Sequence, residues 1–235
     1  MTRKSKLKII SLERSIETKE LKPEIIPDKK LIDILDNFKE NIERINKKFI
    51  IVDELESKKL EEAAKDILRS QIVLLMSSVD FYIHEIVKYG ILKIFTREKN
   101  KTKEYKAFIV SIECVEKAIK NPESIDWLEE NIIVQNKYKS FMALNKIKNA
   151  LKIISDKNIL DNSIKEIAVD LKKEKDEIKD IMSKMYERRN CIAHQTDRDP
   201  IKCNINDISK EEVKSGIQIV NKLILCIHDK VKNDV

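Results

Sequence analysis

Late in the sequence, an arginine and a histidine form a motif that could act on a phosphate group. The segment ERRNCIAHQTDRDP (residues 187–200) places Arg189 five residues before His194. A neutral imidazole is well matched to moving a proton near pH 7. A guanidinium is a strong donor to a phosphate that gains charge in a transition state. The pair predicts one base and one cation, although this spacing alone also fits a surface arginine and a histidine that caps a helix.

A regular helix does not bring these two side chains together. Each residue turns an α-helix by about 100°, so Arg189 and His194 point about 140° apart, whereas Asn190 and His194 share a face. Convergence requires either a helix that ends near Ala193 or a second subunit that supplies a partner. The spacing therefore favours a site shared between two copies of the chain. Asn190 either positions a phosphate or caps the end of the helix.

The residues around this pair resemble a known superfamily. The pattern RRN-x-IAH, followed by a D-R-D-P loop, is similar to the HEPN motif R-x4-6-H. The segment DILRSQIVLLMSSVDFYIHEIV (residues 66–87) resembles the companion helix of the RiboL-PSP-like HEPN group, with Ser78-Val79 where that group has Ala-Leu. The segment KSFMALNKIKNALKII (residues 139–154) is similar to a further stretch of the group. The resemblance extends roughly from Leu35 to Val231.

This resemblance implies a helical bundle and metal-independent RNA cleavage. The ribose 2′-OH would be the nucleophile, the product would end in a 2′,3′-cyclic phosphate, and a homodimer would build the site from both copies. Arg189 and His194 are then the expected catalytic residues, with no metal or cofactor. The expected role is that of a toxin or antiviral-defence effector, with an inhibitor or a defence-complex protein as a further partner. The alternatives are a non-catalytic HEPN module that binds RNA or a partner protein, and a purely structural adaptor.

Three other residues are candidates for supporting roles. Arg188 precedes the catalytic arginine and is expected to support the site or to position RNA. Asp80 and His84, four residues apart, share a face of the companion helix. Asp80 either orients Arg189 through a carboxylate–guanidinium bond or forms a buried polar pair with His84 that sets the helix register. Arg69, in the same apolar helix, is expected to pair with a buried acid.

Composition indicates an all-α fold. The chain has 235 residues, of which 42% are hydrophobic and 37% charged, with only two glycines and four prolines. Sheets need turns built from such residues, so their scarcity favours helices joined by short polar links. The net charge of +6 is compatible with a polyanionic partner but also with simple compositional bias.

Hydrophobic periodicity places a long helix from about Lys30 and a longer one over 57–95, whose apolar centre predicts the most buried helix of the bundle. A charged link covers 97–106, and Asn121-Pro122 separates two short helices. Ser209 and Glu212 form a capping box at the last helix. The remaining helices are expected near 111–120, 125–135, 144–154, 163–172, 174–194 and 209–230, with a loop over 195–207. We expect residues 1–28 to form a poorly defined arm and residues 29–235 to form one HEPN domain.

The four cysteines are widely spaced and lack the CxxC spacing of a zinc site. Three histidines in all disfavour a multi-histidine metal centre. No signal peptide and no membrane-spanning apolar run is seen, so a cytoplasmic protein with free thiols is expected. Cys191, inside the motif, is expected to pack rather than to react.

Overall fold

The computed structural model describes residues 29–234 and shows them to be almost entirely helical. In chain order the helices are α1 (Lys29–Ser57), α2 (Glu61–Phe95), α3 (Lys103–Lys106), α4 (Ile112–Lys120), α5 (Asp126–Asn136), α6 (Leu144–Ile154), α7 (Ile159–Leu171), α8 (Lys175–Gln195) and α9 (Lys210–Lys232). No strand occurs within these residues, which contain a single isolated β-bridge. The predicted all-α class is confirmed.

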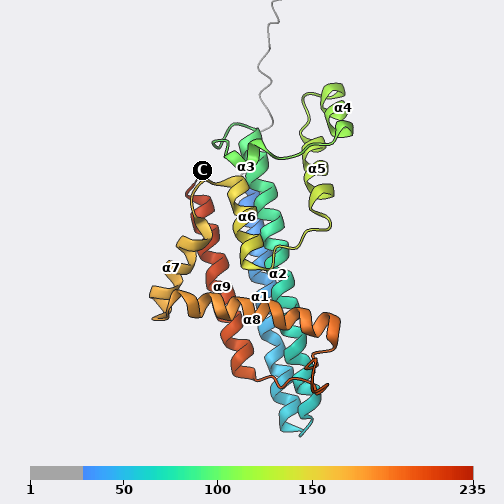
Figure 1. The fold of residues 1–235 in the computed structure, drawn as a ribbon, viewed down its shortest axis with the longest axis vertical. Coiled ribbons are helices and arrows are strands. Elements are labelled where there is room, and N and C mark those ends of the chain that lie inside the picture. Colours follow the sequence, from blue (N-terminus) through green and yellow to red (C-terminus); the bar gives the residue numbers. More distant parts are fainter. Residues whose placement is uncertain (1–28, 235) are drawn as a thin grey trace, which may run out of the picture.

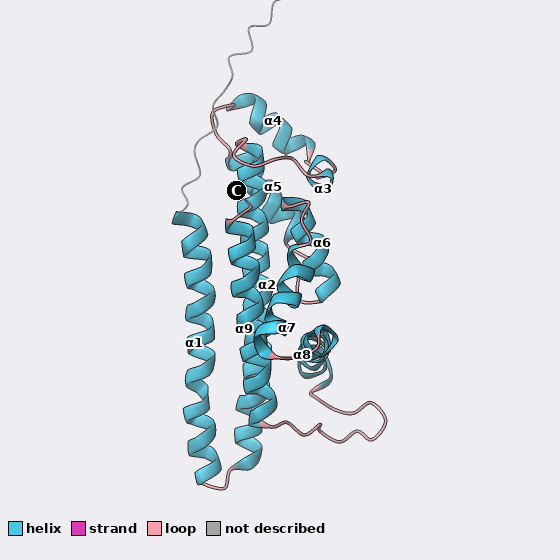
Figure 2. Ribbon diagram, turned by 90° about the vertical axis from the view of Figure 1, so that its left-hand side faces the viewer, coloured by secondary structure: helices cyan, strands magenta, loops and turns pink. Residues whose placement is uncertain are grey.

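Three long helices run along the length of the molecule. Helices α1 and α2 form an antiparallel hairpin, and α9 returns beside them (Figures 1 and 2). The turn between α1 and α2 is short, and Lys59 adopts a left-handed backbone conformation there with φ 59°. Apolar residues recur at three and four residues along α1 and α9, so each helix buries one stripe against its neighbours.

Helix α2 is the central element of the bundle, as its sequence predicts. Residues along its whole length are buried, and Ile72, Tyr82 and Ile86 have no exposed surface. It contacts α1, α5, α6, α8 and α9. Because so many elements pack on it, α2 sets the relative positions of segments that are far apart in the sequence.

The second half of the chain packs across this bundle. Helix α6 lies against the upper part of α2, and α8 lies across the bundle (Figure 1). Gly90 permits the close contact with α6, because a Cβ at this position would lie 2.5 Å from Ile154 Cγ2. Helices α4 and α5 form an excursion beside the bundle (Figure 1).

Local differences from the predicted elements are small. The long helix expected over 57–95 begins at Glu61, after the turn. The charged link over 97–106 contains the short helix α3, which is capped by the Thr102 hydroxyl. The loop after α8 contains a bridge between Arg198 and Ile205. The Ser209 hydroxyl accepts a hydrogen bond from Glu212 N at 3.1 Å, as its sequence motif predicts.

Among the described residues, no helix combines the length and apolar character needed to cross a membrane. The expected N-terminal arm, residues 1–28, lies outside the part of the chain that the structure describes. The extent of the domain therefore stays a prediction.

Candidate active site

The two residues expected to be catalytic lie near the C-terminal end of α8. Arg189 is half-buried and His194 is exposed. The Arg189 Nη1 group donates a hydrogen bond to Asn190 Oδ1 at 3.2 Å. Helix α8 continues through Gln195, so it does not end before His194. Within one chain, the helical rotation therefore keeps Arg189 and His194 about 140° apart.

Two residues directly after α8 have an unusual backbone conformation. Thr196 and Asp197 have φ values of 51° and 57°, in the left-handed region that favours glycine. The Asp197 N–H donates to Cys191 O at 3.1 Å and thereby closes the last turn of the helix. A non-glycine residue costs free energy in this conformation, so other contacts must compensate for it.

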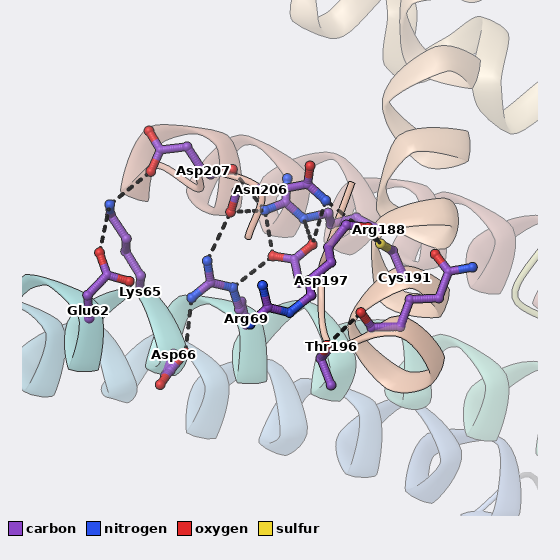
Figure 3. Close-up of polar contacts among 12 residues, drawn as sticks. Glu62, Lys65, Asp66, Arg69, Arg188, Cys191, Thr196, Asp197, Asn206 and Asp207 are labelled. Atoms are coloured by element: carbon purple, nitrogen blue, oxygen red, sulfur yellow. Dashed lines mark hydrogen bonds and ion pairs between the residues drawn. The ribbon is translucent and has the colours of Figure 1, made fainter. Parts of the chain in front are cut away.

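Those contacts come from a buried ion cluster, which we term the Asp197 clamp and define as Arg69, Arg188, Asp197 and Asn206 (Figure 3). Asp197 is fully buried. Its Oδ2 accepts hydrogen bonds from Arg69 Nε at 2.7 Å and from Arg188 Nη2 at 2.8 Å. Its Oδ1 lies 2.7 Å from Arg188 Nε and accepts a weaker bond from Asn206 Nδ2 at 3.4 Å. The clamp joins α2, the end of α8 and the loop that follows it.

Arg69 is the partner of a buried acid, as its position in an apolar helix predicts. Burial alone would lower the pKa of its guanidinium, but the bonds from Asp197 and Asp66 raise the pKa above its ordinary value. Arg69 also donates to Asn206 O at 2.9 Å. The acid itself was not identified from the sequence. Two features of the sequence could have identified it: a buried arginine needs a carboxylate, and Asp197 is the first acidic residue after α8.

Arg188 and Arg189 are neighbours in sequence but have different environments. Arg188 donates to Asp197 and to the backbone carbonyls of Asn206 and Asp207, at 3.2 and 2.8 Å. Through these bonds, Arg188 holds the loop between α8 and α9 in place. Arg189 is outside the clamp and bonds to Asn190 alone in the described part of the chain. Of the two arginines, Arg189 is therefore the one whose charge is not matched by a carboxylate.

The loop after the clamp extends away from the bundle beside the end of α8 (Figure 2). It is held by its own bonds, since Arg198 Nη1 donates to Cys203 O at 2.6 Å. Asp199 Oδ1 accepts from the backbone N–H groups of Ile201 and Lys202, and these bonds lower the pKa of Asp199. At the base of the loop, the half-buried Cys191 thiol lies 3.6 Å from Arg198 O, in a packing position.

Asp80 and His84 lie higher on α2 and contact a different segment. Asp80 Oδ1 accepts a hydrogen bond from Phe141 N at 2.5 Å and lies 3.8 Å from His84 Nε2. His84 Nε2 donates to Lys139 O at 3.2 Å, and its ring packs on Phe141 with centroids 4.5 Å apart. Within one chain, the structure does not join Asp80 to Arg189. It joins Asp80 and His84 to the linker between α5 and α6.

One stripe of α2 has no partner among the described residues. Leu74 and Phe81 are 41% and 47% exposed, and the exposed Ser77 lies between them at helical spacing. By the rotation of a helix, Leu74, Ser77 and Phe81 are turned about 140°, 80° and 120° from Arg69, the clamp residue of α2, so they lie on a different face of this helix. We call residues Leu74, Ser77 and Phe81 the α2 stripe.

Comparison with known proteins gives one finding. A family model described as RiboL-PSP-HEPN matches residues 50–233. No curated protein and no solved structure matches the sequence. The matched region contains α2, α8, the Asp197 clamp and both candidate catalytic residues.

Proposed function

This chain belongs to the RiboL-PSP-HEPN family, and from that premise we propose that it is a metal-independent RNA endonuclease. Family membership supports an RNA-related module in general. The catalytic assignment rests on one observation in the site: among the described residues, the Asp197 clamp engages Arg188 and Arg189 has no carboxylate partner, while His194 on the same helix is exposed. Arg189 and His194 are thus available to a phosphate.

The proposed reaction needs no nucleophile from the protein. The His194 imidazole accepts the proton of a ribose 2′-OH, and the 2′ oxygen attacks the adjacent phosphorus. The bond from phosphorus to the 5′ oxygen breaks, and that oxygen takes a proton from an imidazolium. The products are a 2′,3′-cyclic phosphate and a 5′-hydroxyl. Arg189 stabilises the charge that gathers on the phosphate oxygens during this step.

A second copy of the chain would complete the site. Because α8 stays helical through Gln195, Arg189 and His194 of one chain do not face the same point. Two copies that meet near the ends of their α8 helices would supply two arginines and two histidines around one phosphate. The α2 stripe, on the helix that also carries Arg69, offers an exposed apolar surface for contact between the copies. We propose that the cleavage serves as a toxin or antiviral-defence activity, which an inhibitor or a larger complex restrains.

The decisive experiment is an RNA cleavage assay in EDTA with purified protein. Wild-type protein should release fragments with 2′,3′-cyclic phosphate ends, and His194→Ala should abolish cleavage because no other histidine lies at this site. Gln195→Ala, the adjacent exposed residue of α8, serves as the matched control and should cleave at the wild-type rate. Circular dichroism should show that both variants are folded.

Cleavage that survives His194→Ala, or that requires a divalent metal, would contradict the mechanism. RNA that is bound but stays intact after long incubation would favour the non-catalytic RNA-binding module instead.

A further inference from the structure

The linker between α5 and α6 carries an aromatic residue that is almost completely exposed. Tyr138 is 89% exposed, although apolar rings are normally turned toward the protein. Exposed lysines flank it on both sides, at Lys137 and Lys139. The Lys137 ammonium lies 5.4 Å from the centre of the Tyr138 ring, and Lys139 Nζ donates to the neutral side chain of Asn136. Among the described residues, neither lysine has a carboxylate partner.

This exposed tyrosine stands on a rigid support. Asp80 and His84 of α2 bind the linker through Phe141 N and Lys139 O, and Phe141 is buried against His84. Lys139 N also donates to Asn136 O at 2.9 Å. Bonds on both sides of the tyrosine therefore fix the backbone that presents it. The functional candidates Asp80 and His84 have a role here, in positioning the linker.

A hollow lies between this linker, α5 and α2. Its volume is about 290 Å³, and its lining includes His84, Lys88, Lys137 and Lys139. Lys88 is neutralised by Glu85 at 3.0 Å and by Glu129 at 3.5 Å. Asp80 also lines the hollow, but its carboxylate is bonded to Phe141 N and lies against His84. The lysines of the lining without a carboxylate partner among the described residues are Lys137 and Lys139.

The linker lies on the same side of α2 as the end of α8 (Figure 1). Arg69 marks the level of the active site on α2 through its bond to Asp197, and His84 marks the level of the linker through its bond to Lys139. These residues are 15 positions apart, which corresponds to about 22 Å along a helix. At about 3.4 Å per nucleotide of a stacked strand, about seven nucleotides span this distance.

We propose that Lys137, Tyr138 and Lys139 form a docking platform for single-stranded RNA. An unpaired base stacks on the Tyr138 ring, and the two lysines bind the flanking phosphates. An aromatic ring between cations suits this ligand, because every base has a stacking face and every nucleotide has a phosphate. The platform holds the strand about seven nucleotides from the scissile bond. This inference rests on the proposed RNA endonuclease function and adds a second binding point to it.

The test measures RNA binding in a His194→Ala background, so that cleavage cannot interfere. The probes are fluorescent single strands of about 4 and about 12 nucleotides, and a duplex of the longer sequence. Tyr138→Ala should weaken binding of the longer strand about tenfold, whereas Tyr138→Phe, which keeps the ring, should bind like the parent. The duplex offers no unpaired base, so it should not distinguish the two tyrosine variants. The short strand cannot reach both the site and the platform, so the parent should bind it more weakly than the longer strand.

The lysines are tested by the salt dependence of binding. Exchange of Lys137 and Lys139 for glutamate should reduce the slope of log K against log salt by about 1.4, which corresponds to two lost phosphate contacts on a single strand. The matched control exchanges Lys165 of α7 and Lys175 of α8 for glutamate. It makes the same change in net charge away from the linker and should keep the parent slope.

The possible failures are distinguishable. If the parent binds RNA and Tyr138→Ala binds the long strand equally well, the platform is wrong while the nuclease proposal stands. If Tyr138→Ala weakens the duplex as much as the single strand, the surface does not read unpaired bases and the platform is again wrong. If Tyr138→Ala weakens binding of the long strand but the wild-type protein cleaves no RNA, the platform proposal stands and the nuclease proposal is wrong. A parent that binds no RNA would overturn both.

Discussion

At the residue scale, two adjacent arginines have different roles. Successive residues on a helix point about 100° apart, so one side chain can face the protein while its neighbour faces outward. Arg188 turns to the clamp, where it meets the buried Asp197 carboxylate and two backbone carbonyls. In the part of the chain that the structure describes, Arg189 bonds only to the neutral Asn190 side chain. The Asp197 carboxylate is already bonded to the guanidinium groups of Arg69 and Arg188. Arg189, the second arginine of the motif, is therefore left available for a phosphate.

These roles predict opposite effects for the same substitution. Arg188→Ala removes one cation from a buried carboxylate and should lower the free energy of unfolding by about 2 kcal/mol. Arg189→Ala should change stability little, but should reduce RNA cleavage at least about 100-fold, as expected when a donor to the transition state is removed. Thermal denaturation and cleavage rates of the two variants, measured side by side, test the assignment. An Arg189→Ala protein that is destabilised as much as Arg188→Ala, or that cleaves normally, would contradict it.

At the element scale, the position of α6 on α2 depends on one glycine. A Cβ at Gly90 would lie 2.5 Å from Ile154 Cγ2 and 2.6 Å from Ile154 Cβ. A β-branched side chain near its own backbone has few ways to move aside. Helix α6 must therefore shift if this position acquires a side chain. Because α6 follows the linker that carries Tyr138, the same contact also helps to place the linker.

A pair of glycine substitutions separates packing from helix propensity. Gly90→Ala should destabilise the protein by about 1–3 kcal/mol, because overpacking outweighs the gain of about 1 kcal/mol in helix propensity. Gly216→Ala in α9 should be close to neutral or stabilising, since its Cβ meets the flexible Met185 side chain, which can repack. Urea denaturation of both variants provides the measurement. Equal stability changes would show that the α2–α6 contact is not tight.

At the scale of the whole molecule, we propose that two copies meet through the α2 stripe. It lies on the helix that carries Arg69, and its two large residues remain substantially exposed in the single chain. In a two-fold contact both copies use the same stripe, so each of its apolar residues is buried in both copies. Dimerisation would then both cover this surface and complete the site.

Charges on the stripe should separate the copies without unfolding them. The double variant Leu74→Glu with Phe81→Glu should be monomeric by sedimentation and should lose RNA cleavage, while its helical content is retained because both side chains already face solvent. Ile112→Glu on α4, which is 76% exposed, is the control and should behave as wild type. A double variant that remains dimeric and active would show that the copies meet elsewhere.

The sequence by itself determined the helical class, most helix positions and the Arg189–His194 motif. These properties are local: periodicity, capping and the scarcity of glycine and proline act within a few residues of the chain. The capping of α9 by Ser209 and the burial of α2 followed for this reason.

Only the tertiary structure decided how distant residues are paired. Arg69 and Asp197 are 128 positions apart, and their bond depends on how α8 crosses α2. The sequence showed that Arg69 needed an acid, but many acids were available. The contacts of Asp80 and His84 with the α5–α6 linker, rather than with Arg189, likewise follow from packing. The physical reason is that the partner of a charge is set by the geometry of the folded elements, whereas the need for a partner is set by the residue itself.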